Sequence, residues 1–342
     1  MLRRLLKIKD FSKKKPYPLK LKDIYLSGQN KDLLSQSKFL YDELPIRLSQ
    51  RSIELQSLPD EILNNYSLQK VYDLYINSFE RILNIKKPNN YEDVNNFANI
   101  LSDIKKKHTN IELDIGSAIQ DLRIDNINKY TKKEQKIDLI LNNFYMSRIS
   151  IRFLIGQHLS IINNKNYGMI DNNCNPYKIT QNAIETVCSH TNYDNNIKYN
   201  IYGNNNINLM YISSHLYYII LEILKNATVA VYNSEKKDKN IDITINDGIE
   251  DIIIKISDNG NGIKREVLPL VYSFLYTSSD KDISKENIER NPVISGFGHG
   301  LGLSKIFSNY FGGDIKIVSS YGIGTDIYIY IKKINSNEKI II

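Results

Sequence analysis

Glu222 and Asn226 lie four residues apart in the stretch ILEILKNATVAV (220–231), which is otherwise mostly apolar. Residues four apart share one face of a helix, so this carboxylate and this carboxamide would project side by side. A carboxylate can accept a proton, and a carboxamide oxygen can bind a hard cation such as Mg²⁺. The pair therefore indicates a polar site on one face of a helix that otherwise packs in a core.

A second candidate part of the site is the motif SDNGNGI (257–263), which follows a run of β-branched residues. Gly260 and Gly262 carry no side chain, so the backbone can approach a ligand while Asp258 stays fixed at the end of a strand. Alone, this motif is weak evidence, because Asp-Asn-Gly also forms ordinary turns.

The third candidate part is the stretch GFGHGLGLSKIF (296–307), which has a glycine at every second position from 296 to 302 ahead of a predicted helix. Backbone amides in such a loop and the N-terminus of the helix form an anion site. No Gly-Lys-Ser/Thr follows, which excludes a Walker A loop, and the spacing excludes the dinucleotide fingerprint. Phosphate binding is the prediction, and GIGTD (322–326) would turn Gly324 and Thr325 toward the same pocket.

The elements that must position these motifs fall into two halves. From about residue 30 to 165, apolar residues recur at helical spacing in four long segments with short polar joints, which predicts a helical bundle. The polar stretch 164–178 serves as a boundary. Beyond it, alternating or β-branched stretches predict strands at 241–246, 251–257, 314–320 and 325–333.

The second half is therefore a mixed α/β domain, with helices expected on one face of a largely antiparallel sheet. Residues 278–295 are charged and lack periodicity, so we expect a long mobile loop, of the kind that forms lids, between the glycine-bearing motifs.

The net charge of +7 comes from the N-terminus, because the first 22 residues hold nine Lys or Arg and one acid. The remainder is nearly neutral, which gives no argument for nucleic-acid binding. Residues 1–20 are basic with leucines on one helical face, and are either a mitochondrial presequence or a disordered basic tail. No apolar run approaches the roughly 18 residues of a membrane span. The two cysteines, Cys174 and Cys188, make no disulfide framework and suit a reducing compartment.

The order of the motifs carries more information than any one of them. A Glu-x-x-x-Asn helix, Asp-x-Gly-x-Gly, a glycine-rich stretch and Gly-x-Gly-Thr resemble, in that order, the Bergerat-type ATP site of gyrases, heat-shock chaperones, histidine kinases and the mitochondrial 2-oxo acid dehydrogenase kinases. Longer stretches are similar to the pyruvate and branched-chain 2-oxo acid dehydrogenase kinases: SKFLYDELPIRLSQRSIELQSLPDEIL (37–63), FYMSRISIRFLIGQH (144–158), SSHLYYIILEILKNA (213–227) and GFGHGL (296–301).

This resemblance covers about residues 20 to 333 and implies the fold. An N-terminal four-helix bundle (21–170) would precede a histidine-kinase-like ATPase α/β sandwich (176–335). The implied cofactors are ATP and Mg²⁺. Phosphoryl transfer needs positioning and charge neutralisation more than covalent chemistry, which suits the motifs.

The resemblance also implies roles for single residues. Glu222 would act as general base on a substrate serine and would border the nucleotide, Asn226 would ligate Mg²⁺, and Asp258 would hydrogen-bond adenine. Gly260 and Gly262 would let the backbone approach the adenine. The other implied nucleotide-binding residues are Lys225, Thr277, Ser278, Gly296, Phe297, Gly298, His299, Gly300, Leu301 and Thr325.

The implied activity is that of a protein serine kinase in the mitochondrial matrix. It would phosphorylate and inactivate the E1 alpha subunit of a pyruvate or branched-chain 2-oxo acid dehydrogenase complex. The bundle would dock on the E2 lipoyl domain, and two copies would form a homodimer through the ATP domain. Neither a nucleic acid nor a membrane is an expected partner.

Departures from the family pattern keep two alternatives open. Thr228 and Val229 stand where the family usually has Met-Arg, and Tyr218 stands where pyruvate dehydrogenase kinases tend to have His. These exchanges motivate a catalytically weak adaptor that binds lipoyl domains. GLGLS (300–304) matches the box of histidine protein kinases, the second alternative.

Other departures concern histidine and proline. His299 replaces an aromatic residue, and Gly302 stands where the family often has Pro. No histidine lies in a phosphoacceptor pattern, so we expect His158 and His215 to be structural.

Overall fold

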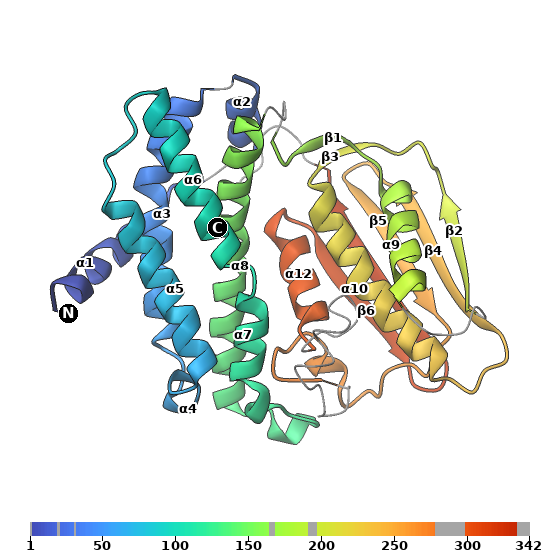
Figure 1. The fold of residues 1–342 in the computed structure, drawn as a ribbon. Coiled ribbons are helices and arrows are strands. Elements are labelled where there is room, and N and C mark those ends of the chain that lie inside the picture. The colour runs from blue at the N-terminus through green and yellow to red at the C-terminus, as the bar shows by residue number, and fades with distance from the viewer. Residues whose placement is uncertain are drawn as a thin grey trace.

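The computed structural model describes residues 2–18, 21–30, 32–163, 168–190, 197–277 and 298–333. A helical half lies beside an α/β half, and α8 and α12 meet between them (Figure 1). Both parts of the predicted fold are therefore present. Within the described residues, no helix combines the length and the apolar character that crossing a bilayer requires.

Four long helices build the helical half, as the sequence predicted. They are α3 (Leu33–Leu55), α5 (Tyr66–Leu83), α6 (Tyr91–Lys107) and α8 (Lys132–Ile162). The shorter elements are α1 (Leu2–Ser12), α2 (Leu21–Asn30), α4 (Asp60–Leu63), α7 (Ile111–Ala118), η1 (Gln120–Leu122) and η2 (Ile127–Lys129).

Local side-chain chemistry sets where the long helices begin. Asp32, Asn65 and Asn90 each accept a backbone N–H at the start of α3, α5 and α6. Thr131 and Glu134 form a capping box at the start of α8. The apolar faces then meet in one core, which contains the predicted residues Leu44, Leu48, Leu55, Leu58, Val71, Tyr75, Phe79 and Ile82.

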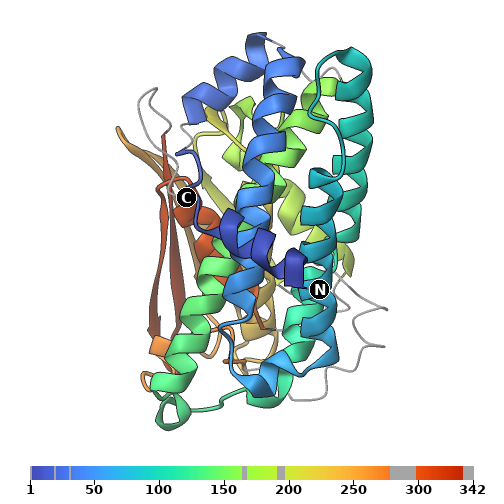
Figure 2. The same cartoon turned by 90° about the vertical axis from the view of Figure 1, so that its left-hand side faces the viewer.

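The N-terminal segment forms helix α1, which lies across the outer side of the bundle (Figure 2). Ile8 is buried, and the ring of Phe11 meets that of Phe79 edge-on at 5.4 Å between centroids. Arg4 pairs with Glu80 at 2.7 Å. These contacts make the segment part of the bundle core, while its cleavage as a presequence stays a prediction.

The α/β half contains a five-stranded sheet in the order β2-β4-β5-β7-β6. Its strands are β2 (Ile197–Gly203), β4 (Lys239–Asp247), β5 (Asp251–Asp258), β6 (Asp314–Ser320) and β7 (Gly324–Lys332). All pairings are antiparallel except that of β2 with β4, which agrees with the predicted largely antiparallel sheet.

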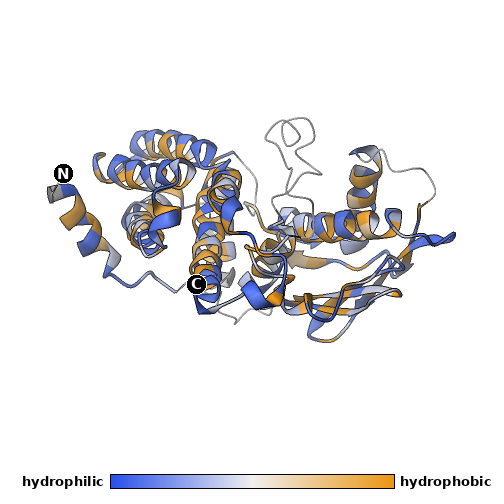
Figure 3. Ribbon diagram, turned by 90° about the horizontal axis from the view of Figure 1, so that it is seen from below, coloured by the Kyte–Doolittle hydropathy of each residue, from blue (hydrophilic) through white to orange (hydrophobic). Residues whose placement is uncertain are grey.

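Helices cover one face of this sheet, as Figure 3 shows. They are α9 (Pro176–His190), α10 (Ser213–Tyr232) and α12 (Gly300–Tyr310). A short 3₁₀ helix, η3 (Leu268–Leu270), lies between β5 and residues 278–297, which are not among the described residues. A separate pair of strands, β1 (Asp171–Cys174) and β3 (Leu209–Tyr211), was not anticipated, and neither was β2. The predicted mobile loop 278–295 lies outside the described residues.

Candidate functional site

One stripe of helix α10 links the two glycine-bearing regions of the site. Glu222, Asn226 and Ala230 follow each other at spacings of four, so they share a face of the helix. Gly300 abuts the first of them, and Gly260 abuts the last. Eight residues of α-helix span about 12 Å, so the stripe forms one wall of an elongated site.

Glu222 marks the end of this stripe nearest α12. Its Oε1 accepts a hydrogen bond from Lys225 Nζ at 2.7 Å, and both side chains are largely buried. A side chain at Gly300 would collide with Oε2 of Glu222. The missing side chain at 300 therefore lets the first turn of α12 approach the carboxylate.

Asn226, in the middle of the stripe, is exposed although its neighbours Lys225 and Ala227 are buried. Its side chain is therefore accessible to a ligand that lies along α10. A carboxamide oxygen in this position is suitable for a hard divalent cation.

Asp258, at the end of β5, marks the other end of the site. Its Oδ1 accepts the N–H of Gly260 at 2.9 Å, which fixes the carboxylate at the start of the turn. Burial raises the pKa of Asp258 to about 6, against the opposing effect of backbone hydrogen bonds from Gly260 and Thr325. This carboxylate thus lies in a poorly solvated position where a hydrogen-bond donor on a ligand would stabilise it.

The glycines of the Asp258 turn make room for protein backbone. A Cβ at Gly260 would lie 2.7 Å from the carbonyl carbon of Ala230, and one at Gly262 would collide with Ser320 O. The sequence interpretation was that Gly260 and Gly262 allow the backbone to approach the adenine closely. In the structure they bring β5 against α10 and against the hairpin after β6.

Thr325 is buried beneath this end of the site. It pairs in register with Asp258 across β5 and β7, and its Oγ1 lies 2.9 Å from Ser319 Oγ. Ser319 in turn accepts the N–H of Ile263 at 2.8 Å. These bonds tie the Asp258 turn to the last two strands, so Thr325 supports the predicted adenine end from below.

Thr277 and Gly298 flank the undescribed stretch and lie against each other. A Cβ at Gly298 would be 2.9 Å from Cβ of Thr277, and Gly298 has φ +78°, which disfavours other residues. Ser278, Gly296 and Phe297, which the sequence also assigned to the nucleotide, lie outside the described residues.

His299 does not point into the site. Its buried ring packs between those of Tyr145 and Phe274, with centroid distances of 6.2 and 5.4 Å. Burial lowers the pKa of His299 to about 3, so the ring is neutral. Only its backbone remains for a nucleotide, because the side chain serves the junction between the two halves.

Helix α12 begins at Gly300, so two of the glycines expected ahead of it lie inside it. Leu301 is in its first turn and is partly buried. Gly302 is buried, and a Cβ there would lie 2.7 Å from Tyr272 O. Tight packing, rather than loop flexibility, accounts for this second glycine.

Two of the departures noted in the sequence can be placed on α10. Tyr218 lies one turn before Glu222 and packs on Phe307, and burial raises its pKa well above the usual range. The Thr228 hydroxyl lies 2.9 Å from Tyr199 OH, whereas Val229 is exposed. Tyr218 therefore stays protonated at neutral pH and supplies no base.

Lys236 is a residue of the site that sequence reasoning missed. Its Nζ donates to Ile323 O at 2.6 Å and more weakly to Gly260 O at 3.4 Å, and its charge lowers the pKa of Asp258 against the effect of burial. It fastens the Asp258 turn to the β6–β7 hairpin. No sequence motif marks it, because its partners are backbone carbonyls far along the chain.

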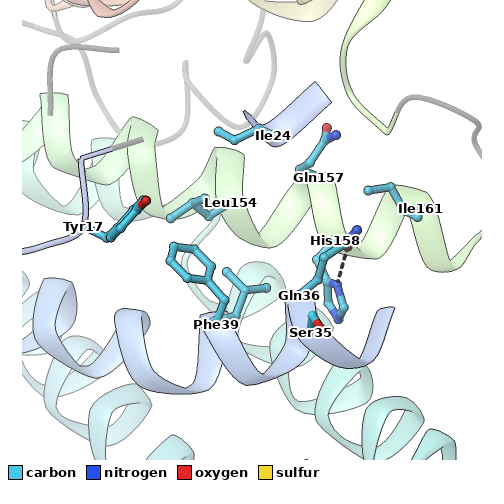
Figure 4. Close-up of a pocket in the computed structure, with 10 residues that line it drawn as sticks. Tyr17, Ile24, Ser35, Gln36, Phe39, Leu154, Gln157, His158 and Ile161 are labelled. Atoms are coloured by element: carbon cyan, nitrogen blue, oxygen red, sulfur yellow. Dashed lines mark hydrogen bonds between the residues drawn. The ribbon is translucent and has the colours of Figure 1, made fainter. Parts of the chain in front are cut away.

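A cavity lies in the helical half, between α2, α3 and α8 (Figure 4). This cavity of about 280 Å³ is lined mainly by apolar side chains, with a few polar groups at one end. At that end His158 Nδ1 lies 3.3 Å from Gln36 Oε1, and its Nε2 lies 3.1 Å from Ser37 Oγ. The lining residues are Tyr17, Ile24, Ser35, Gln36, Phe39, Leu40, Leu154, Gln157, His158 and Ile161.

The α10 site fits a magnesium nucleotide in its donor set. A desolvated carboxylate at one end suits an amino group of a base, and an exposed carboxamide in the middle suits a cation. The close approach of Gly300 to Glu222 brings the N-terminus of α12, a favourable position for anions, to the other end. The adenine base, the cation and the phosphates of a nucleotide can therefore bind in that order along helix α10.

Comparison with known proteins finds two family models that match this chain. Residues 18–188 match the family described as mitochondrial branched-chain alpha-ketoacid dehydrogenase kinase. Residues 211–335 match the family described as histidine kinase-, DNA gyrase B-, and HSP90-like ATPase. The first match contains the bundle, and the second contains the α10 site.

Curated relatives match nearly the whole chain. The mitochondrial pyruvate dehydrogenase (acetyl-transferring) kinase of Arabidopsis thaliana is 32% identical, over 90% of this chain and 87% of the relative. Isozyme 4 of the same kinase from Rhinolophus ferrumequinum is 30% identical, over 96% of this chain and 84% of the relative. The Drosophila melanogaster kinase is also 30% identical, over 94% and 82%.

Proposed function

Since the chain belongs to the family of mitochondrial 2-oxo acid dehydrogenase kinases, we propose that it phosphorylates a serine of an E1 alpha subunit and thereby inactivates that dehydrogenase complex. The observation that carries the proposal is the α10 stripe, on which Glu222, Asn226 and Ala230 join the two glycine-bearing regions. Kinase activity of the pyruvate dehydrogenase kinase type and the use of ATP follow from the family itself.

In this proposal MgATP supplies the phosphoryl group, and the residues of the chain bind and orient the reactants. Asn226 would hold Mg²⁺, and Asp258 would accept a hydrogen bond from the adenine amino group. Thr325 and Lys236 keep the Asp258 turn in place. Placement of this kind supplies most of what phosphoryl transfer requires from a protein.

Glu222 would accept the proton of the serine hydroxyl. Its Oε2 faces Gly300, at the end of the site where the N-terminus of α12 favours phosphate. Lys225 donates a hydrogen bond to Oε1, which orients the carboxylate and compensates its charge.

The bundle cavity supports the proposal that the E2 lipoyl domain docks on the helical half. A lipoyl-lysine arm is a long aliphatic chain that ends in an apolar ring. A cavity bordered by Phe39, Leu154 and Ile161 can bury such an arm, and the polar side chains of Gln36 and His158 lie at one end of it.

The proposed location is the mitochondrial matrix, since the curated relatives are named mitochondrial. A homodimer through the ATP domain is part of the same proposal. Both rest on the family, and neither is needed for the chemistry of the α10 site.

The deciding experiment is transfer of labelled phosphate from ATP, with Mg²⁺, to purified E1 alpha subunits of the pyruvate and branched-chain complexes in parallel. We expect acid-stable label on a serine of one subunit. Acid-labile label on the chain itself would instead identify a histidine protein kinase. Nucleotide binding with no labelled E1 alpha would identify the adaptor, which the exchanges at Tyr218 and Val229 motivate.

A further inference from the structure

We propose that Asp138, on α8 of the helical bundle, is a positioning residue for the nucleotide site in the other half of the molecule. It fixes the segment 273–277, whose last residue, Thr277, borders the site. This inference rests on the proposed function only in taking the α10 site as the place where nucleotide binds.

The segment 273–277 is bound to the bundle through both side-chain and backbone contacts. Asp138 Oδ1 accepts the N–H of Phe274 at 2.9 Å. The N–H of Ile124, in the loop after η1, donates to Leu275 O at 2.9 Å, and Ile124 forms a parallel bridge with Tyr276. A stretch of the ATP half therefore uses the bundle as its pairing surface.

Asp138 is itself held in place by the bundle. Its Oδ2 accepts a hydrogen bond from Tyr130 OH at 2.7 Å, so the carboxylate bridges a bundle tyrosine and the backbone of Phe274. Burial raises the pKa of Asp138, and the hydrogen bonds from Ser273, Tyr130 and Phe274 oppose that effect. A partly buried carboxylate is costly to keep unless such bonds compensate it.

The ring of Phe274 connects the segment 273–277 to the start of helix α12. Its ring lies 4.9 Å from that of Tyr145 and 5.4 Å from that of His299, centroid to centroid. A Cβ at Gly302 would lie only 3.2 Å from the same ring. A displaced Phe274 would therefore disturb the residue that precedes α12 and the first turn of that helix.

Two glycines, Gly298 just before α12 and Gly300 at its start, each contact a proposed site residue. Gly298 lies against Thr277, and Gly300 lies against Glu222. The position of Phe274 thus bears on the residues expected to face the phosphates and on the carboxylate expected to act as base. Through Asp138, helix α8 determines how well the phosphate end of the site is formed.

The test compares Asp138→Ala and Asp138→Asn in the full chain, with ATP and Mg²⁺ as the probe in titration calorimetry. We expect the alanine variant to bind about tenfold more weakly, which corresponds to roughly 1.4 kcal/mol, because the Phe274 N–H loses its acceptor. The asparagine variant keeps an oxygen for that N–H and should recover most of the affinity.

Hydrogen exchange supplies a readout that general destabilisation would not reproduce. The amides of Phe274 and Ile124, which donate to Asp138 and to Leu275 O, should exchange faster in Asp138→Ala, while those in the middle of α5 keep their protection. The matched control is Asp114→Ala, which removes a carboxylate that accepts from Lys70 Nζ at 2.9 Å at the surface of the bundle. It should alter neither nucleotide affinity nor exchange at Phe274.

The proposal is overturned if Asp138→Ala leaves nucleotide affinity unchanged, or if Asp114→Ala weakens it equally. Should Asp138→Ala not fold, Tyr130→Phe removes only the bond to Oδ2. It must then produce a smaller loss of affinity together with faster exchange at Phe274, and no change in either overturns the proposal. A protein that binds nucleotide but labels no E1 alpha would refute the proposed function and leave this test in force.

Discussion

Each half of the molecule holds an ion pair with little exposed surface, Glu43–Arg47 in the bundle and Glu222–Lys225 on α10, and the two pairs differ in how many further partners they have. In the bundle, Arg47 is 1% exposed and Glu43 is 5% exposed, and they pair at 2.7 Å. Arg47 also donates to Ser150 Oγ and to Tyr17 O, and Glu43 accepts the N–H of Tyr17. Arg47 thus has partners from three separate parts of the bundle, and among the residues that the structure describes Glu43 has two partners, Arg47 and the backbone of Tyr17.

In the α/β half, the Glu222–Lys225 pair has fewer partners among the described residues. Lys225 donates to Oε1 of Glu222, Asn226 is exposed, and Asp258 accepts backbone hydrogen bonds from Gly260 and Thr325. A carboxylate oxygen or a carboxamide that the protein does not engage is available to a ligand. The comparison predicts that substitutions in the bundle lower stability, and that substitutions in the site lower function.

The largest effect should come from Glu222→Gln. Removal of a general base typically costs 10²- to 10⁴-fold in rate, so phosphate transfer to E1 alpha should fall by about that factor. Glutamine keeps an oxygen for Lys225, so ATP affinity in calorimetry should remain close to that of the unaltered chain. An unchanged transfer rate would remove Glu222 from the role of base and weaken the contrast between the halves.

Arg47→Met tests the bundle side of the comparison. It leaves Glu43 as an uncompensated buried charge, which typically costs about 3–5 kcal/mol of unfolding free energy. Denaturant unfolding measures this loss. The double variant Glu43→Leu with Arg47→Met should recover part of it, because no charge then stays unpaired. Nucleotide affinity at temperatures where the variant is folded should not change, and a specific loss of affinity would contradict the comparison.

Asn226→Ala should have a smaller effect, confined to function. Loss of the carboxamide should weaken Mg²⁺-dependent ATP binding by at least about 10–100-fold. This is the loss of affinity that substitutions of residues around a metal site typically cause. The side chain is exposed, so the free energy of unfolding should change by no more than about 0.5 kcal/mol. Titration of ATP with and without Mg²⁺ separates the two contributions, and equal losses in both would exclude Asn226 as a metal ligand.

The smallest expected effect is a pH dependence at the Asp258 end. Burial raises the pKa of Asp258 to about 6, so the carboxylate is largely ionised at pH 7 and largely protonated at pH 5. The ionised form is the better acceptor for an amino group, so affinity for adenosine should fall as pH drops, by at most about tenfold per unit. Adenosine avoids titration of phosphate, and Asp258→Asn should bind weakly with no such pH dependence.

Elements with a local signal were predictable from the sequence. The four bundle helices and strands β4 to β7 follow from hydrophobic periodicity, and Glu222 and Asn226 share a face because a helix has 3.6 residues per turn. Strands β1 and β3 lack that signal, whereas β2 carries it in the alternation of Ile197, Tyr199 and Ile201 with polar residues. Strand β2 belongs to the sheet through its parallel partner β4, about 40 residues further along the chain.

Other features depend on contacts between distant segments, which no local pattern records. The sequence assigned His299 to the nucleotide, but its side chain packs between Tyr145 and Phe274, where the two halves meet. Lys236 became recognisable as a site residue only once Gly260 O and Ile323 O were seen beside it.

The sequence by itself determined the order of the motifs, which resembles that of an ATP site and from which the proposed site residues follow. Only the tertiary structure decided which close contacts the glycines of that site allow. Gly260 and Gly300 admit the backbone of α10 and the carboxylate of Glu222, respectively, and so bring two distant segments onto one helix. The physical reason is steric, since a Cβ at Gly260 would collide with the backbone of Ala230, and one at Gly300 would displace the carboxylate of Glu222.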